Sequence, residues 1–194
     1  MAAFEHRMRI NTIYAAGYSL KDGDLSARLH DIAPTWGSWK TWRDCGTHNV
    51  ICHDIGQARA LSQRALQAVC NFYIPEKFYI RLDRPSYMRY YQGDFEHQVS
   101  DIEDIISMHL VAPESDLVLM LGFFLGKTSM PEDALIQHQI RHRMGLIRSC
   151  IRNHPHTQWV LVDHPGELDT AFAALSNVTT DTMSSVMTLL NSST

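Results

Sequence analysis

The sequence predicts a single α/β domain over residues 1–194: a doubly wound, mostly parallel sheet of about five or six strands with helices on both faces, in a Rossmann-like three-layer arrangement. Two observations predict it. Short apolar stretches alternate with amphipathic helical stretches, and the stretch 116–122 is continuously apolar after its first residue, as in a strand buried on both faces. A chain of 194 residues with 45% hydrophobic residues also has the size and composition of one globular domain.

The first expected element is a strand at 10–16, which is rich in β-branched and aromatic residues. A helix at 24–32 would end before Pro34. Trp36, Trp39 and Trp42 follow at intervals of three residues, a spacing typical of one aromatic helical face packed on the sheet, or of a lid. The expectation for the next part is a strand at 48–52, a helix at 57–72, a strand at 77–82 and a long loop at 83–98.

The C-terminal half repeats strand and helix more regularly. Pro131, Glu132 and Asp133 suit the first turn of a long helix, because proline fits that position and acidic side chains are favourable at the positive end of the helix dipole. The expected elements are a helix at 99–110, a strand at 116–122, a helix at 131–153, a strand at 158–163, a helix at 167–175, a strand at 178–182 and a helix at 184–190.

Polar and charged side chains follow the expected strands at the points where they end. Parallel strands end at one edge, and α/β sheets bind ligands outside this carboxyl edge. We therefore expect His53 and Asp54 as acid–base groups, with Asp163 as a third catalytic candidate that orients polar groups or a metal. The alternative is that such residues only cap turns and helix starts. The expected ligand-binding residues are Ser19, Asp83, Arg84, Gly122, Lys127, Thr128 and His164.

The stretch 121–128, LGFFLGKT, comes close to a phosphate-binding P-loop but departs from it. The pattern GxxxxGK[ST] needs its first glycine one residue earlier than Gly122, and Phe123 and Phe124 are bulky for a loop that wraps a phosphate. The stretch 159–163, WVLVD, resembles a Walker B strand, whose aspartate would help to hold Mg²⁺ if the ligand is a nucleotide. The sequence disfavours a working P-loop and leaves Lys127 as an isolated anion contact.

The residues 13–17, IYAAG, form a strand and turn that resemble the opening strand of nucleoside 2-deoxyribosyltransferases and related N-glycosidases. The resemblance covers this strand and turn. It implies a compact α/β fold and a carboxylate near the glycosidic carbon of the substrate. Asp94, Glu96 and Glu103 are the carboxylates on offer, but none lies in a matching motif, so no catalytic residue is carried over.

Histidine and cysteine spacing predicts no metal site. His138 and His142 lie four residues apart and would share one helix face, but no third ligand follows from the spacing. Cys52 and His53 are neighbours in the chain, and neighbouring side chains of a strand point to opposite faces.

Net charge, the lack of apolar targeting segments and one loop limit the partners and the location that we expect for the protein. The net charge of −4 predicts no general attraction to nucleic acid or membranes, although acidic residues gather at 94–116 and arginines at 134–162. The sequence shows no signal peptide and no apolar run long enough to span a bilayer, so the expected location is the cytoplasm. The loop 81–91 mixes arginine with tyrosine, which suits a nucleotide clamp or a protein interface.

Two functions remain open at this point. The first is a small cytosolic protein that binds a nucleotide-like or other phosphorylated ligand at the carboxyl edge, as a hydrolase or transferase acting on its glycosidic or phosphate part. The alternative is a non-catalytic subunit or inhibitor that uses this fold to bind a protein partner or a second copy. Phe123 and Phe124 separate the two: they favour the alternative if they close the edge, and the first function if they pack beneath it and Lys127 points into a cleft.

Overall fold

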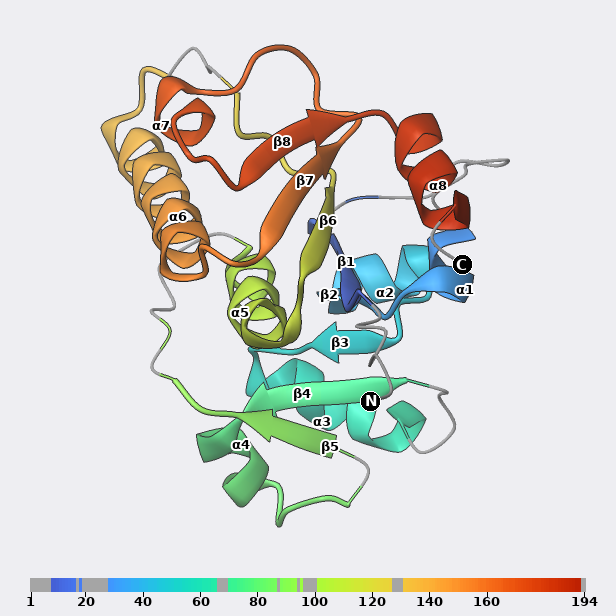
Figure 1. Cartoon of the computed structure of the whole chain (residues 1–194). Coiled ribbons are helices and arrows are strands. Elements are labelled where there is room, and N and C mark those ends of the chain that lie inside the picture. Colours follow the sequence, from blue (N-terminus) through green and yellow to red (C-terminus); the bar gives the residue numbers. More distant parts are fainter. Residues whose placement is uncertain are drawn as a thin grey trace.

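Eight parallel strands form one sheet in the order β5-β4-β3-β2-β1-β6-β7-β8 (Figure 1). The computed structural model describes residues 8–16, 18, 28–65, 70–86, 88–93, 95, 101–126 and 131–192, without the side chains of 61–65 and 192. The strands are β1 (Ile10–Tyr14), β2 (Thr35–Ser38), β3 (Asn49–Ile51), β4 (Asn71–Pro75), β5 (Met88–Tyr91), β6 (Leu117–Leu121), β7 (Gln158–Val162) and β8 (Val178–Asp181). The α/β class is confirmed, with more strands than the five or six expected.

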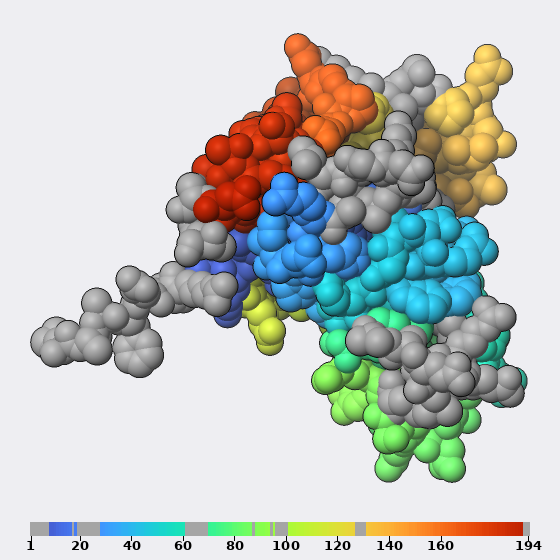
Figure 2. All heavy atoms as spheres, turned by 90° about the vertical axis from the view of Figure 1, so that its right-hand side faces the viewer, coloured from blue at the N-terminus to red at the C-terminus, as the bar shows by residue number. Residues whose placement is uncertain are grey.

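Helices cover both faces of the sheet. They are α1 (Leu29–Ile32), α2 (Trp39–Cys45), α3 (Ile55–Ala65), α4 (Glu76–Arg81), α5 (Ile102–Val111), α6 (Ala134–Asn153), α7 (Thr170–Ala173) and α8 (Met183–Ser192), with a short 3₁₀ turn at Ala112–Glu114. Side chains of α5, α6 and α7 pack on one face, while those of α1, α2, α4 and α8 pack on the other. Figure 2 shows α8, α1 and α2 side by side on the second face.

The central strands are buried on both sides, as the apolar run at 116–122 predicts. Ile13 on β1 and Met120 on β6 are opposite each other and belong to the core beneath α5 and α6. Their neighbours Tyr14 and Leu121 belong to the core beneath α1 and α8. This alternation follows from the two-residue period of a strand, and burial on both faces removes any polar alternation from the sequence.

The order of the strands reverses between β1 and β6. From β1 the chain moves outward through β2, β3, β4 and β5, then crosses back through α5 to β6 and continues to β7 and β8. The two central strands therefore lead their chains to opposite faces, which leaves a crevice at their carboxyl ends. Ligands of open α/β sheets bind at such a point.

Four expectations between residues 35 and 98 are wrong in whole or in part. Residues 35–38 are a strand instead of the start of a helix, residues 77–82 fall largely in α4 instead of a strand, and β5 lies within the expected loop. Strand β4 occupies the end of the expected helix 57–72, with Phe72 and Ile74 fully buried on one side. The cause is that short apolar runs fit both periodicities, so flanking residues such as Pro75 and Glu76 decide where a helix begins.

None of the helices within the described residues is long and apolar enough to cross a membrane. All four cysteines are free thiols.

Two glycines, one crowded and one with open space around it, test the packing described at the carboxyl end of β6. Gly122 has a φ of +75°, and a Cβ there would lie 2.8 Å from Tyr18 Cδ2, so Gly122→Ala should destabilise the fold by about 1–3 kcal/mol. Gly145 lies inside α6 with nothing within 4 Å of an added Cβ, so Gly145→Ala should stabilise by about 0.5–1 kcal/mol. Urea unfolding of both variants measures the two changes. Equal effects of the same sign would contradict the described packing at Gly122.

Candidate functional site

The carboxyl end of β1 is held by a buried carboxylate. The backbone N–H of Ala16 donates to Asp104 Oδ1 at 2.9 Å, and Arg143 Nη2 donates to Asp104 Oδ2 at 2.8 Å. Asp104 lies in the first turn of α5 and is 1% exposed, while the Arg143 side chain on α6 is 19% exposed. One side chain thus joins β1, α5 and α6 at the point where the strand order reverses.

Burial governs the protonation of this carboxylate. It raises the pKa of Asp104 to about 7, against the opposing effect of the Arg143 charge and the Ala16 hydrogen bond. The negative charge of Asp101 raises the pKa further. A buried carboxylate with one charged partner and one backbone donor is satisfied in its hydrogen bonds but loses much of its hydration.

A polar pocket of about 140 Å³ opens beside this carboxylate at the carboxyl edge. It is formed by the end of β1, the start of α2, the first turn of α3 and the start of α5. Among the described residues, the Lys40 ammonium makes no hydrogen bond, and the Glu103 carboxyl bonds only to its own backbone. The lining residues are Ala16, Ser38, Trp39, Lys40, Gln57, Asp101 and Glu103.

The pocket carries more negative than positive charge. Burial raises the pKa of Glu103, and the charges of Asp101 and Asp54 raise it further, while Lys40 opposes them. Glu103 therefore keeps its proton to higher pH than an exposed glutamate does. A carboxyl with a raised pKa can act as a general acid at a pH at which an exposed glutamate is already ionised.

The residues predicted after β3 lie next to elements that form this pocket, but neither His53 nor Asp54 is among its lining residues. His53 is 7% exposed, and its Nδ1 shares a 2.8 Å hydrogen bond with the Tyr91 hydroxyl at the end of β5. Burial raises the pKa of Tyr91, and the negative charge of Glu103 raises it further. Asp54 is exposed, and its Oδ1 accepts from the backbone N–H of Gln57 at the start of α3.

The residues predicted after β6 and β7 form a second group. His164 Nε2 accepts from the Leu125 N–H at 3.0 Å, and its ring stacks on Phe124 with centroids 5.5 Å apart. Asp163 Oδ1 accepts from the Met183 N–H at 2.9 Å, so this carboxylate caps the start of α8. Both predicted residues lie at the carboxyl edge, but their polar atoms support local structure.

Phe123 and Phe124 take different positions. Phe123 is 3% exposed and packs in the core beneath the edge, whereas Phe124 is 42% exposed. The packing of Phe123 agrees with a ligand-binding edge. The other part of that test, the direction of Lys127, lies outside the described residues.

Asp83 and Arg84 do not line the pocket. Asp83 and Arg84 follow α4 and lead into the amino end of β5, so they lie outside the row of strand ends. Both have positive φ angles, 61° and 51°. Ser19, Lys127 and Thr128 lie outside the described residues, as do Asp94 and Glu96.

Sequence reasoning missed most of the residues that surround Glu103. Lys40 and Gln57 lie in the first turns of the helices that follow strands β2 and β3. Because the sequence did not predict β2, it gave no reason to place Lys40 at the end of a strand. Asp104 is an acidic residue in a helix that is buried nearly all round, a pattern that signals a charged partner. That partner, Arg143, lies 39 residues away and was not identifiable from spacing.

A larger cavity, of about 810 Å³, opens at the opposite, amino edge of the sheet. Several of its polar side chains are bonded to one another: Asn11 accepts from Trp36 Nε1 and donates to Ser115, and Asn49 accepts from Asn71. The His30 ring also lines this cavity, and its buried Nε2 has no hydrogen-bond partner among the described residues. The smaller pocket differs in its position at the carboxyl edge and in the acidic side chains that line it. We therefore place the candidate site at the carboxyl edge, where open α/β sheets bind ligands.

Comparison with protein-family models, curated proteins and solved structures finds no match to this chain.

The pKa of Asp104 predicts a pH-dependent stability. The native state binds this proton more tightly than the unfolded state, whose pKa is near 3.8, so the free energy of unfolding should fall as pH rises from about 4 to about 7. Asp104→Asn removes this contribution, and the difference between wild-type and variant urea-unfolding curves isolates it. Replacing the exposed Asp31 by Asn is the matched control and should leave the dependence of the unfolding free energy on pH as it is in the wild type. If Asp104→Asn also kept the wild-type pH dependence, Asp104 would not be the group that causes it.

Proposed function

We propose that the chain binds the sugar part of a nucleotide-like ligand in the pocket beside Glu103 and acts on its glycosidic bond. One observation carries the proposal: a small polar pocket at the carboxyl ends of β1, β2 and β3 holds a glutamate whose pKa is raised by burial and by the nearby charges of Asp101 and Asp54. Ligand sites for whole drug-sized molecules measure about 300–1,000 Å³. A pocket of 140 Å³ suits one group of a larger ligand.

The charges favour a sugar over a phosphate at this position. Asp101, Glu103 and Asp54 would repel a phosphate, with Lys40 as the one cation among the lining residues. Sugar hydroxyls instead donate hydrogen bonds to carboxylates, as the ribose does to the acidic residue of dinucleotide-binding sheets. The phosphate part of a nucleotide would then point away from these side chains.

Glu103 would act as the general acid. It donates its proton to the departing base, water bonds to the anomeric carbon, and a neighbouring carboxylate such as Asp101 accepts the proton of that water. The products are the free base and the sugar, which keeps its phosphate when the ligand is a nucleotide. The resemblance of residues 13–17 to N-glycosidases supports the same chemistry, and Asp104 holds the strand end that forms one wall of the pocket.

Glu103→Gln separates binding from chemistry. The amide keeps the size of the side chain but cannot donate the acid's proton, so release of free base from nucleosides or nucleotides should fall about 10²–10⁴-fold, while binding stays within a few-fold. Chromatography measures base release, and calorimetry measures binding.

The exposed Glu132→Gln at the start of α6 is the control for this experiment and should behave like the wild type. Unchanged base release in Glu103→Gln would remove Glu103 from the chemistry. Absence of binding by nucleosides and nucleotides alike would overturn the proposed function.

A second candidate, association with another protein chain, is favoured by the surface of α6. None of the first 13 residues of this helix is buried, and Leu135 and Ile136 are 65% and 46% exposed. Figure 2 shows this part of α6, in golden yellow, projecting at the upper right of the molecule. Asp133 Oδ1 accepts from the Leu135 and Ile136 N–H groups and holds the helix start in place.

Sedimentation velocity tests whether this surface joins two copies. The wild type should associate as concentration rises, and the double substitution Leu135→Ser with Ile136→Ser should weaken association at least tenfold because it removes exposed apolar area. Leu189→Ser on α8, where leucine is 60% exposed, is the control. A wild type that stays monomeric would contradict self-association.

A further inference from the structure

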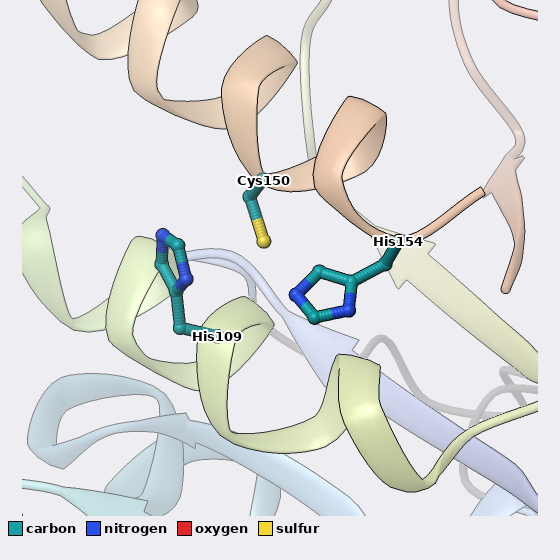
Figure 3. Close-up of side chains that lie close together, drawn as sticks. All are labelled: His109, Cys150 and His154. Carbon is teal, nitrogen blue, oxygen red and sulfur yellow. The ribbon is translucent and has the colours of Figure 1, made fainter.

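Three metal-binding side chains meet between α5 and α6. His109 comes from α5, Cys150 from α6, and His154 follows directly after the last residue of α6. Their nearest ligand atoms, two imidazole nitrogens and one sulfur, all lie within 4.8 Å of one another. Figure 3 shows the Cys150 sulfur and the two rings turned toward one shared space.

Helical geometry explains why these residues converge. Cys150 and His154 are four residues apart, so they lie one above the other on the same side of the helix end. Arg148 and Arg152, two residues on either side of Cys150, are exposed and lie about 200° around the helix, on the opposite side. The cationic side of α6 therefore does not face the three donors.

The surroundings hold the three side chains in place. The His154 carbonyl accepts from the Thr157 N–H at 3.2 Å and from Asn177 Nδ2 at 3.1 Å, which fixes the turn after α6. The ring of Phe95 packs against that of His109, with centroids 5.8 Å apart. Cys150 is fully buried. Positioning of ligands by neighbouring groups before the metal arrives is what a tight site requires.

Within the part of the chain that the structure describes, the donor atoms have no competing hydrogen-bond partner. Among the described residues, no hydrogen bond involves the rings of His109 and His154 or the Cys150 thiol. Burial lowers the pKa of His109, with the neighbouring His154 as a second cause, so this imidazole is held in the neutral form that binds metals. Burial also raises the pKa of Cys150 to about 12, so an incoming metal meets a thiol.

We propose that His109, Cys150 and His154 bind one Zn²⁺ ion. Two imidazoles and one thiolate are ligands of borderline to soft character, which Zn²⁺ accepts and which Mg²⁺ and Ca²⁺ do not prefer. Zinc–nitrogen bonds of about 2.0–2.1 Å and zinc–sulfur bonds of about 2.3 Å imply tetrahedral donor separations of about 3.3–3.6 Å. The donor atoms lie within 4.8 Å of one another, so side-chain rotations that move them by on the order of 1 Å bring them to these separations.

Binding exchanges a proton for the metal. Zn²⁺ forms a bond to the Cys150 sulfur, and the thiol proton passes to solvent. Three protein ligands leave the fourth tetrahedral position for water. The ion would join α5 to α6 near the amino edge of the sheet, six residues along α5 from Glu103, so this site is separate from the proposed glycosidic site.

Cobalt substitution tests the site in protein that carries no histidine tag. Co²⁺ should bind at one equivalent, with the visible bands of tetrahedral cobalt and the near-ultraviolet charge-transfer band of a cobalt–thiolate bond. Zn²⁺ should displace it and raise the melting temperature. Cys150→Ser should abolish the charge-transfer band. Loss of a residue that only orients a metal ligand weakens metal binding about 10–100-fold, and loss of the Cys150 ligand itself should weaken it more.

Two further variants keep this test decisive if Cys150→Ser folds poorly. His154→Gln changes a half-buried residue and should weaken binding to the same extent. The control is His138→Gln, which disrupts the stacked pair of His138 and His142 on α6 and should leave the one-equivalent site intact. Cys70→Ser is the control for thiol chemistry. A charge-transfer band that survives Cys150→Ser, or binding lost in His138→Gln alone, would overturn the proposal.

Discussion

The hydrogen bonds of one buried carboxylate, that of Asp104, hold the centre of this fold together. Asp104 accepts from the Ala16 N–H at the end of β1 and from Arg143 on α6, so it fixes α5 and α6 against the strand from which the sheet is built outward. Removing either partner leaves buried polar groups of the other without a hydrogen bond, which costs about 1–3 kcal/mol. Because Glu103 precedes Asp104 in the first turn of α5, these contacts also help to position Glu103.

Helix α5 links the two sites proposed for this molecule. Its first turn supplies Asp101, Glu103 and Asp104 to the carboxyl edge, and its last turn supplies His109 to the group of metal ligands. The helix is buried nearly all round, because it crosses the sheet between β5 and β6 and is covered by α6. Polar side chains in so buried a helix each need a partner or a ligand. Asp104 has Arg143, whereas Glu103 and His109 face space that a ligand and a metal ion could occupy.

The sequence predicts the C-terminal half of the fold well and the middle poorly. The apolar run at 116–122 and the capped helix at 131–153 carry strong, unambiguous periodicity, and both elements are confirmed. Between residues 35 and 98 the apolar runs are short, so the KFYIR stretch of α4 reads equally as a strand. The carboxyl edge was predictable from topology, but Lys40, Arg143 and the convergence of His109 with Cys150 depend on contacts between distant segments. Spacing within one segment does not reveal these contacts.

The central claim is that Asp104 is buried and paired at the end of β1, and its own titration tests this most directly. Carboxyl carbon chemical shifts, followed by nuclear magnetic resonance from pH 3 to pH 9 and assigned with Asp104→Asn, report the pKa of this one group. The account predicts a midpoint of about 7, accompanied by a shift of the Ala16 amide over the same range. A midpoint near 3.8, the value of an exposed aspartate, with no response of Ala16, would contradict it.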